Sequence, residues 1–105
     1  MVIKSRTRAL RRTLDVHSDE VRSVLRRYGA SNPRLFGSVA RGEATTDSDI
    51  DLLVDLDPGM GNTLLRIAGL SEELSQLLGV RVDVVSDEFL LEGVSQAARA
   101  EAVAL

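Results

Sequence analysis

The chain has 105 residues, enough for one domain and not for two, and because only 3% of its residues are aromatic, the core must consist mainly of Leu, Val, Ile and Ala. The net charge of −3 argues against a protein that binds nucleic acid nonspecifically, and the absence of cysteine excludes disulfide bonds and thiolate metal sites. No apolar stretch approaches the ~20 residues of a membrane span, and residues 1–14 lack the apolar region of a signal peptide, so we expect a cytoplasmic protein without membrane association.

Basic residues are concentrated at the start of the chain, and we divide it into a basic N-terminal segment, 1–14, and a single domain, 15–105. The first quarter contains eight basic residues: Lys4, Arg6, Arg8, Arg11, Arg12, Arg22, Arg26 and Arg27. Residues 1–14 contain few large apolar side chains, so we expect a ragged start or an early helical turn. Two interpretations of the basic residues stay open, a solvated surface or a contact with an acidic partner or nucleic acid.

The first long helix is predicted from about Asp15 to Tyr28. Its apolar residues recur at i, i+3, i+4 and i+7, which places on one stripe Val21, Val24, Leu25 and Tyr28. Asp15 or Ser18 could cap the start of this helix, and Gly29 is placed to end it. We interpret His17, the single histidine, as a surface or capping residue.

Two strands are predicted in the middle of the chain, separated by a short helical turn. Residues 34–36 are typical of a strand, residues 39–43 could form one helical turn, and the small polar residues 44–48 indicate a loop. Residues 50–55 are the clearest strand, since apolar residues dominate and alternate side chains face opposite sides. One face is expected to carry Ile50, Leu52 and Val54, and the other Asp49, Asp51 and Leu53.

A second long helix and a third strand are predicted in the C-terminal half. The helix covers about residues 62–78, with Gly69 weakening the preference, and its buried candidates are Leu64, Ile67, Leu70, Leu74, Leu77 and Leu78. Residues 80–86 are typical of a strand, and Asp87 could cap a last helical stretch. The order helix, strand, short helix, strand, helix, strand, helix predicts the α/β (α+β) class, with a small mixed sheet of about three strands packed by helices.

Three aspartates lie where a carboxylate is costly unless it is paired or bound to a metal. Asp49 and Asp51 begin an apolar strand and share one face, and Asp83 interrupts a later apolar strand, where a salt bridge to Arg81 or Arg34 is an alternative explanation. If the two strands are neighbours, the three carboxylates converge. Oxygen ligands without Cys or clustered His favour Mg²⁺ or Mn²⁺ over zinc, and substrate phosphates usually complete such a site, which indicates phosphoryl or nucleotidyl transfer.

A phosphate-binding turn is predicted upstream of these acids. Gly37 and Ser38 end the first strand and open a short helix. Glycine lets the backbone approach a phosphate closely, and a helix N-terminus presents free N–H groups to an anion. Arg41, one turn later, is placed to reach a triphosphate. Each feature alone is common in proteins, but their combination with Asp-x-Asp and a later aspartate is rare.

Residues 36–54 resemble the core motif of the polymerase-beta-like nucleotidyltransferase superfamily, and within it the minimal nucleotidyltransferases, antitoxins that pair with HEPN-domain toxins. The family motif is Gly-Ser, ten residues and Asp-x-Asp, and ten residues separate Ser38 from Asp49 in this chain. The stretch Val-Asp-Val-Val at 82–85 matches the third acid of the family. The resemblance covers roughly residues 15–105.

The resemblance implies a nucleotidyltransferase fold and an enzyme that uses ATP as co-substrate. Gly37 and Ser38 would bind the triphosphate, and Arg41 matches a frequent basic position. Two Mg²⁺ ions would be held by Asp49, Asp51 and Asp83, of which Asp83 would also help to deprotonate the attacking hydroxyl. Members of the family transfer AMP to a tyrosine hydroxyl of the cognate toxin and thereby neutralise it. Because this chain lacks a second domain for an antibiotic or RNA acceptor, a protein acceptor is favoured.

Two alternative functions stay open beside the protein adenylyltransferase. The first is an antitoxin that neutralises its toxin by binding, without catalysis. The second is a nucleotidyltransferase with a small-molecule or RNA acceptor, for which the basic N-terminus is the only support. In each case, a domain of this size could cover apolar helix surface in a homodimer or against a toxin.

Overall fold

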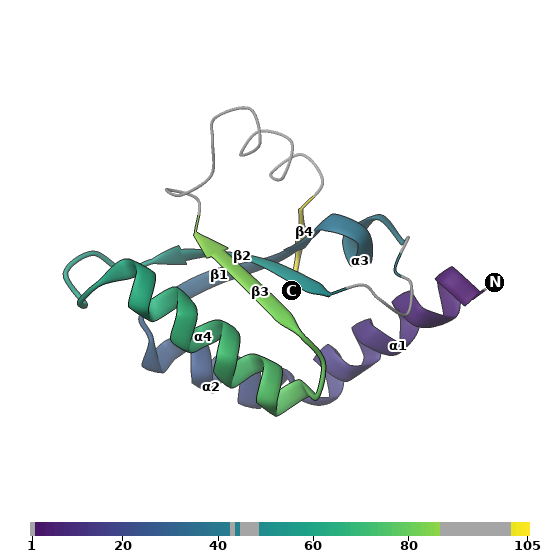
Figure 1. Ribbon diagram of the computed structural model, residues 1–105, viewed down its shortest axis with the longest axis horizontal. Coiled ribbons are helices and arrows are strands. Elements are labelled where there is room, and N and C mark those ends of the chain that lie inside the picture. Colours follow the sequence, from purple (N-terminus) through teal and green to yellow (C-terminus); the bar gives the residue numbers. More distant parts are fainter. Residues whose placement is uncertain (1, 43, 45–48, 87–101) are drawn as a thin grey trace.

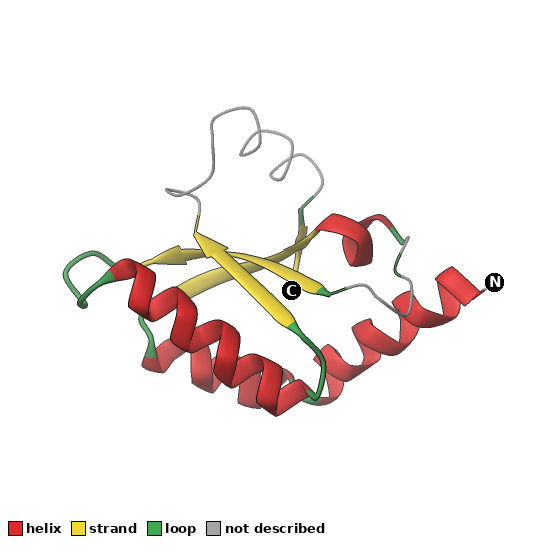
Figure 2. Cartoon of the chain, in the orientation of Figure 1, coloured by secondary structure: helices red, strands yellow, loops and turns green. Residues whose placement is uncertain are grey.

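The computed structural model describes residues 2–42, 44, 49–86 and 102–105, which form a sheet with helices packed against it (Figure 1). In chain order the elements are α1 (Val2–Val16), α2 (Ser18–Arg27), β1 (Ala30–Phe36), α3 (Gly37–Arg41), β2 (Ile50–Leu56), α4 (Thr63–Leu78), β3 (Val82–Ser86) and β4 (Val103–Ala104). The predicted α/β class is confirmed. The described sheet has four strands rather than about three (Figure 2).

The sheet is mixed, with the strand order β3-β2-β1-β4. Strand β1 is antiparallel to both β2 and β4, whereas β2 and β3 are parallel. The strands that carry Asp51 and Asp83 are therefore neighbours, which is the condition for the aspartates to converge. Because β1 and β2 are antiparallel, the end of β1 lies beside the start of β2, which carries Asp51.

The core lies between the sheet and the long helices. The predicted inward residues of β2 and β3 are buried, and they pack in one cluster with leucines and valines of α1, α2 and α4; the strand members are Ile50, Leu52, Val54, Val82 and Val84. Leu53, on the face of Asp51, is fully buried as well. The central strand β2 is thus covered on both faces, which holds its backbone firmly beneath the aspartates at its start.

Of the two expectations for the N-terminal segment, the ragged start is wrong and the early helical turn is too short, because the segment forms a 15-residue helix. Leu10 and Leu14 lie four residues apart on one face of α1 and are only 1% and 2% exposed. The Ala44 backbone N–H donates to the Thr7 hydroxyl at 3.1 Å, which joins α1 to the segment that follows α3. Two leucines in an otherwise basic segment are too few to predict from the sequence that this helix packs against the core.

The helix predicted from about Asp15 to Tyr28 is interrupted near His17. Helix α1 ends at Val16 and α2 begins at Ser18, with His17 at the N-cap position and no side-chain capping hydrogen bond, so neither Asp15 nor Ser18 caps this start. The His17 ring instead lies 3.2 Å from a Glu20 carboxylate oxygen. The predicted apolar stripe of α2 is confirmed, and Gly29 follows the helix in the left-handed conformation, with φ 67°.

Helix α4 lies where the sequence predicts it, capped by Asn62 and ended by Gly79. Leu70, Leu74 and Leu78 are buried as expected, whereas Leu64 is 63% exposed and the prediction of its burial is wrong. Arg66, two residues later, is buried in its place. Its guanidinium can enter the core because several backbone carbonyls satisfy it, a compensation that no periodicity reveals.

The last part of the chain is described only at its end. The helix expected after Asp87 lies outside the described residues, while Val103–Ala104 pair with β1 as strand β4. Among the helices that the structure describes, none is long and apolar enough to cross a membrane.

Candidate active site

Two of the predicted acidic residues are brought together by the parallel pairing of β2 and β3. Asp51 and Asp83 are direct Cα partners in the strand register. Asp49 precedes β2 by one residue, and the side chains of Asp49 and Asp83 are 32% and 42% exposed. One end of the sheet therefore carries three partly exposed carboxylates, which a ligand from solvent can reach.

The Gly-Ser turn meets the same end of the sheet. Phe36, the last residue of β1, pairs with Asp51, and Gly37 opens α3 immediately after it. Gly37 has φ 71°, and a Cβ atom at this position would collide with Oδ2 of Asp51. Glycine is needed here both for its backbone conformation and for the close approach of backbone to carboxylate. Ser38 follows in the first turn of α3.

The charges around Asp51 oppose its ionisation. Burial raises the pKa of Asp51, the negative charges of Asp83 and Asp49 raise it further, and the total brings the pKa to about 6. The nearby Arg41 and Arg81 guanidiniums act in the opposite direction and do not cancel these effects. A carboxylate repelled by two others in this way is a strong candidate for binding a cation.

Arg81 lies between two of the acids. Its Nε atom lies 3.6 Å from Oδ2 of Asp49 and 3.5 Å from Oδ1 of Asp83, and its side chain is 73% exposed. The alternative pairing of Asp83 with Arg81 is thus confirmed, whereas Arg34 pairs with Asp55 at 2.7 Å. Exposed pairs at these distances are weak, so Arg81 can be displaced at little cost.

The donor set of this site fits a divalent cation. Within the residues that the structure describes, no group of three or more His, Cys, Asp or Glu side chains is already arranged to hold a metal ion. Carboxylate oxygens are nevertheless the ligands that Mg²⁺ prefers, and a cation would remove the repulsion that raises the pKa of Asp51. The residues that would supply these oxygens are Asp49, Asp51 and Asp83.

A cluster of arginines beside the site was not predicted as a unit. Arg8 and Arg11 of α1 and Arg41 of α3 line one cavity of about 360 Å³, together with Thr7 and Gly42. The spacing of Arg8 and Arg11, three residues apart, is the one signal in the sequence that would place both on one helix face. That α1 packs beside α3 could not be read from the sequence.

The comparison of sequences points to enzymes. The chain matches the family described as a nucleotidyltransferase domain over residues 19–103. A relative from Thermococcus cleftensis, the protein adenylyltransferase MntA, is 40% identical over 90 residues, which cover 86% of this chain and 86% of the relative.

The comparison of structures points the same way. A structure described as a minimal nucleotidyltransferase is 47% identical, has a TM-score of 0.77, and covers 90% of this chain and 94% of that one. The crystal structure of a toxin–antitoxin with AMP-PNP is 23% identical, has a TM-score of 0.68, and covers 82% of this chain and 69% of that one. The likeness to this second structure is one of fold.

Proposed function

Since the chain belongs to the nucleotidyltransferase domain family and is a nucleotidyltransferase, we propose that it transfers AMP from ATP to a protein hydroxyl and acts as an antitoxin. The acceptor is a tyrosine of a HEPN-type toxin, which the transfer neutralises. The relative named protein adenylyltransferase and the toxin–antitoxin of the same fold support this choice among the reactions of the family.

One observation carries the catalytic part of the proposal, the register that sets Asp51 beside Asp83 directly under the Gly37 turn. Figure 1 shows that α3, the start of β2 and the start of β3 share one end of the sheet. A triphosphate held by the Gly37-Ser38 backbone would extend across the carboxylates. A protein that neutralised its toxin by contact alone would have no use for a half-buried carboxylate opposed by two neighbouring charges.

In the proposed reaction, the acceptor hydroxyl oxygen attacks the α-phosphorus of ATP. A new O–P bond forms, the bond between the α-phosphorus and the bridging oxygen breaks, and pyrophosphate leaves with the bond electrons. Asp83, 42% exposed, accepts the proton of the hydroxyl, while Gly37 and Ser38 orient the triphosphate. Arg41, whose charge acts on the Asp51 pKa, balances negative charge on the phosphates.

The residues that would hold Mg²⁺ are Asp49, Asp51 and Asp83. When bound there, Mg²⁺ would neutralise phosphate charge and lower the pKa of the acceptor hydroxyl. Asp51 would then ionise more readily, because the cation offsets the repulsion from Asp83 and Asp49 that raises its pKa.

Transfer of label from α-labelled ATP tests the proposal. The purified protein, Mg²⁺ and the HEPN-like protein encoded next to it are incubated, and label is expected on a tyrosine of that protein. The Asp49→Asn/Asp51→Asn variant should lose at least about 10³-fold in rate, because two carboxylates that neutralise developing charge are removed. Asp55→Asn serves as the matched control, since Asp55 pairs with Arg34 at the other end of β2.

Two results would overturn the proposal. A wild-type protein that binds its partner tightly without transferring label would be an antitoxin that acts by binding. Full toxin neutralisation in cells by the Asp49→Asn/Asp51→Asn variant would lead to the same conclusion. Label on a small molecule or an RNA 3′ end, and none on protein, would keep the reaction and replace the acceptor.

A further inference from the structure

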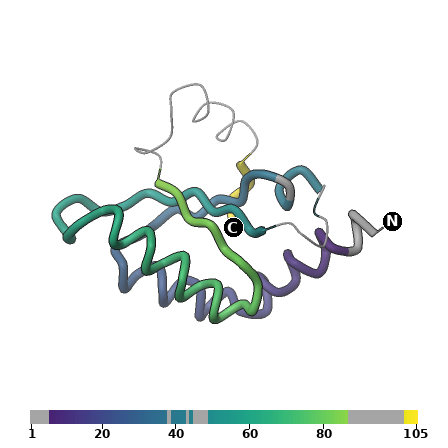
Figure 3. The backbone as a smooth tube through the Cα atoms, viewed as in Figure 1, coloured from purple at the N-terminus to yellow at the C-terminus, as the bar shows by residue number. Residues whose placement is uncertain are grey.

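The cavity between α1 and α3 has an unusual lining. Among the residues that the structure describes, its lining consists of Thr7, Gly42 and three arginines, Arg8, Arg11 and Arg41. Figure 3 shows α1 extending to the end of the sheet at which α3 lies. Three guanidiniums around one cavity repel one another, and an anion inside it would turn that repulsion into attraction.

The cavity is built by the packing of the fold. Thr7, at the cavity wall, is 9% exposed and accepts the Ala44 backbone hydrogen bond, while Leu10 is buried in the core at 1% exposure. These contacts on one face of α1 set the rotation of the helix. Arg8 and Arg11 are therefore turned outward on the side of α3.

Arg41 links the cavity to the candidate active site. This residue lines the cavity, and its charge also acts on the pKa of Asp51 in the acidic cluster. It ends the five-residue helix that Gly37 opens, so cavity and glycine turn lie at opposite ends of one short element, about 6 Å apart. A ligand with several phosphates can span that length.

We propose that this cavity is the subsite for the terminal phosphates of the nucleotide, with Arg8 and Arg11 of α1 completing it. Planar guanidiniums match phosphate oxygens through paired hydrogen bonds, which suits two adjacent arginines on a helix face. The proposal rests on the proposed function, which supplies the triphosphate. It assigns to the N-terminal helix a role in substrate binding and in holding the pyrophosphate that leaves.

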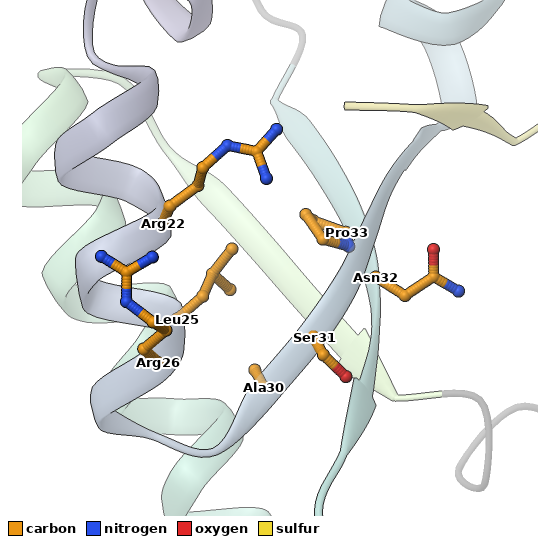
Figure 4. Close-up of a pocket in the computed structure, with 7 residues that line it drawn as sticks. All are labelled: Arg22, Leu25, Arg26, Ala30, Ser31, Asn32 and Pro33. Carbon is orange, nitrogen blue, oxygen red and sulfur yellow. The ribbon is translucent and has the colours of Figure 1, made fainter.

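A second cavity does not compete for this role. It measures about 190 Å³ and lies between α2 and β1, lined by residues that include Arg22, Arg26 and Pro33 (Figure 4). Its strand residues run from Ala30 to Pro33, and Pro33 is three strand residues, on the order of 10 Å, from Phe36, beside which the acids lie. None of the described residues that line this cavity belongs to α3 or to the acidic cluster.

Nucleotide affinity tests the proposal without a requirement for turnover. Titration calorimetry with Mg²⁺ is run on wild type and Arg8→Gln/Arg11→Gln with three probes: AMP-PNP, AMP and inorganic pyrophosphate. The double variant should bind AMP-PNP and pyrophosphate about 10-fold or more weakly, because charged hydrogen bonds to phosphate are lost. Its affinity for AMP should stay within about twofold, since AMP lacks the terminal phosphates.

The matched control is Arg12→Gln, which removes an equally exposed charge from α1 outside the cavity and should leave all three affinities unchanged. Unchanged AMP-PNP affinity in the double variant overturns the proposal. So does a loss confined to pyrophosphate, which would indicate a free-anion site, or a loss confined to toxin binding, which would indicate a protein contact. If phosphate-dependent binding falls as expected while wild type transfers no AMP, the subsite stands and the proposed function fails.

Discussion

At the scale of single residues, Asp51 is the carboxylate of the site whose ionisation is opposed most clearly. This carboxylate is opposed by burial and by the charges of Asp83 and Asp49, and the Gly37 backbone packs directly against it. Its pKa of about 6 lies above the ordinary 3.8, so the folded protein holds this proton more tightly than the unfolded chain does. The protonated Asp51 carboxyl therefore contributes to the stability of the fold, fully below about pH 3.8, and this contribution is lost as the pH rises through about 6.

We predict that Asp51→Asn stabilises the metal-free protein at pH 8, by about 1 kcal/mol, while it abolishes transfer. The amide keeps the shape of the carboxylate and removes the charge that its neighbours repel. The advantage over wild type should shrink as the pH falls from 6 toward 4, where the wild-type carboxyl is protonated. Urea unfolding in chelator at several pH values measures the difference.

Addition of Mg²⁺ provides the control for this substitution. The cation should stabilise wild type and leave Asp51→Asn nearly unchanged. A variant that is less stable than wild type at pH 8 without metal would show that Asp51 is held by favourable contacts and would refute the account of its pKa.

At the scale of elements, α2 and α4 pack through a glycine. A Cβ atom on Gly69 would collide with the ring of Tyr28, whose hydroxyl donates to Glu73 at 2.9 Å. Glu73 also accepts from Arg27 at 2.8 Å, so one carboxylate of α4 binds two neighbouring residues at the end of α2. A glycine that weakens α4 as an isolated helix thus permits its contact with α2.

We predict that Gly69→Ala destabilises the protein by about 1–2 kcal/mol, since the clash exceeds the gain of about 1 kcal/mol in helix propensity. In a Tyr28→Ala background, the same substitution should be stabilising, because the ring is gone and the propensity remains. Chemical denaturation of wild type, the two single variants and the double variant gives the double-mutant cycle that measures this coupling. An equal effect of Gly69→Ala in both backgrounds would exclude the ring as the cause.

At the scale of the whole molecule, one buried arginine joins three segments. Arg66 of α4 is 8% exposed and donates from Nη2 and Nε to the Tyr28 carbonyl, from Nη2 to the Gly29 carbonyl and from Nη1 to the Asp57 carbonyl, at 2.7 to 3.1 Å. The carbonyls at the C-terminal end of α2 are thereby satisfied by a positive charge, where the helix dipole favours one. The same side chain holds the connection that follows β2.

We predict that Arg66→Leu lowers the free energy of unfolding by about 3 kcal/mol, because buried carbonyls lose their donors. Arg66→Lys should restore only part of the lost free energy of unfolding, since an ammonium group cannot reach all three carbonyls at once. Leu65→Ala, at a position 72% exposed on the same helix, is the control and should change stability by less than about 0.5 kcal/mol. Stability of Arg66→Leu equal to wild type would refute this account.

These scales differ in how far they can be predicted from sequence. Local periodicity of apolar residues predicts helix α4, the strand at 50–55 and the apolar stripe on α2, because it depends only on residues close in the sequence. The burial of Leu64 was predicted from the same periodicity and is wrong, because Arg66 takes the inward position one turn before Leu70, where its guanidinium is satisfied by backbone carbonyls. Tertiary contacts of a polar side chain leave no periodic signal.

The amino-acid sequence by itself determined the chemistry that this protein can carry out. The spacing of Gly37, Ser38, Asp49, Asp51 and Asp83 is local within each segment, and it indicated the nucleotidyltransferase family without coordinates. Only the tertiary structure decided how those segments meet: the parallel register of Asp51 with Asp83, and the packing of a basic helix beside Arg41. The physical reason is that strand pairing and helix docking depend on which distant apolar faces fit together, and no stretch of sequence specifies that alone.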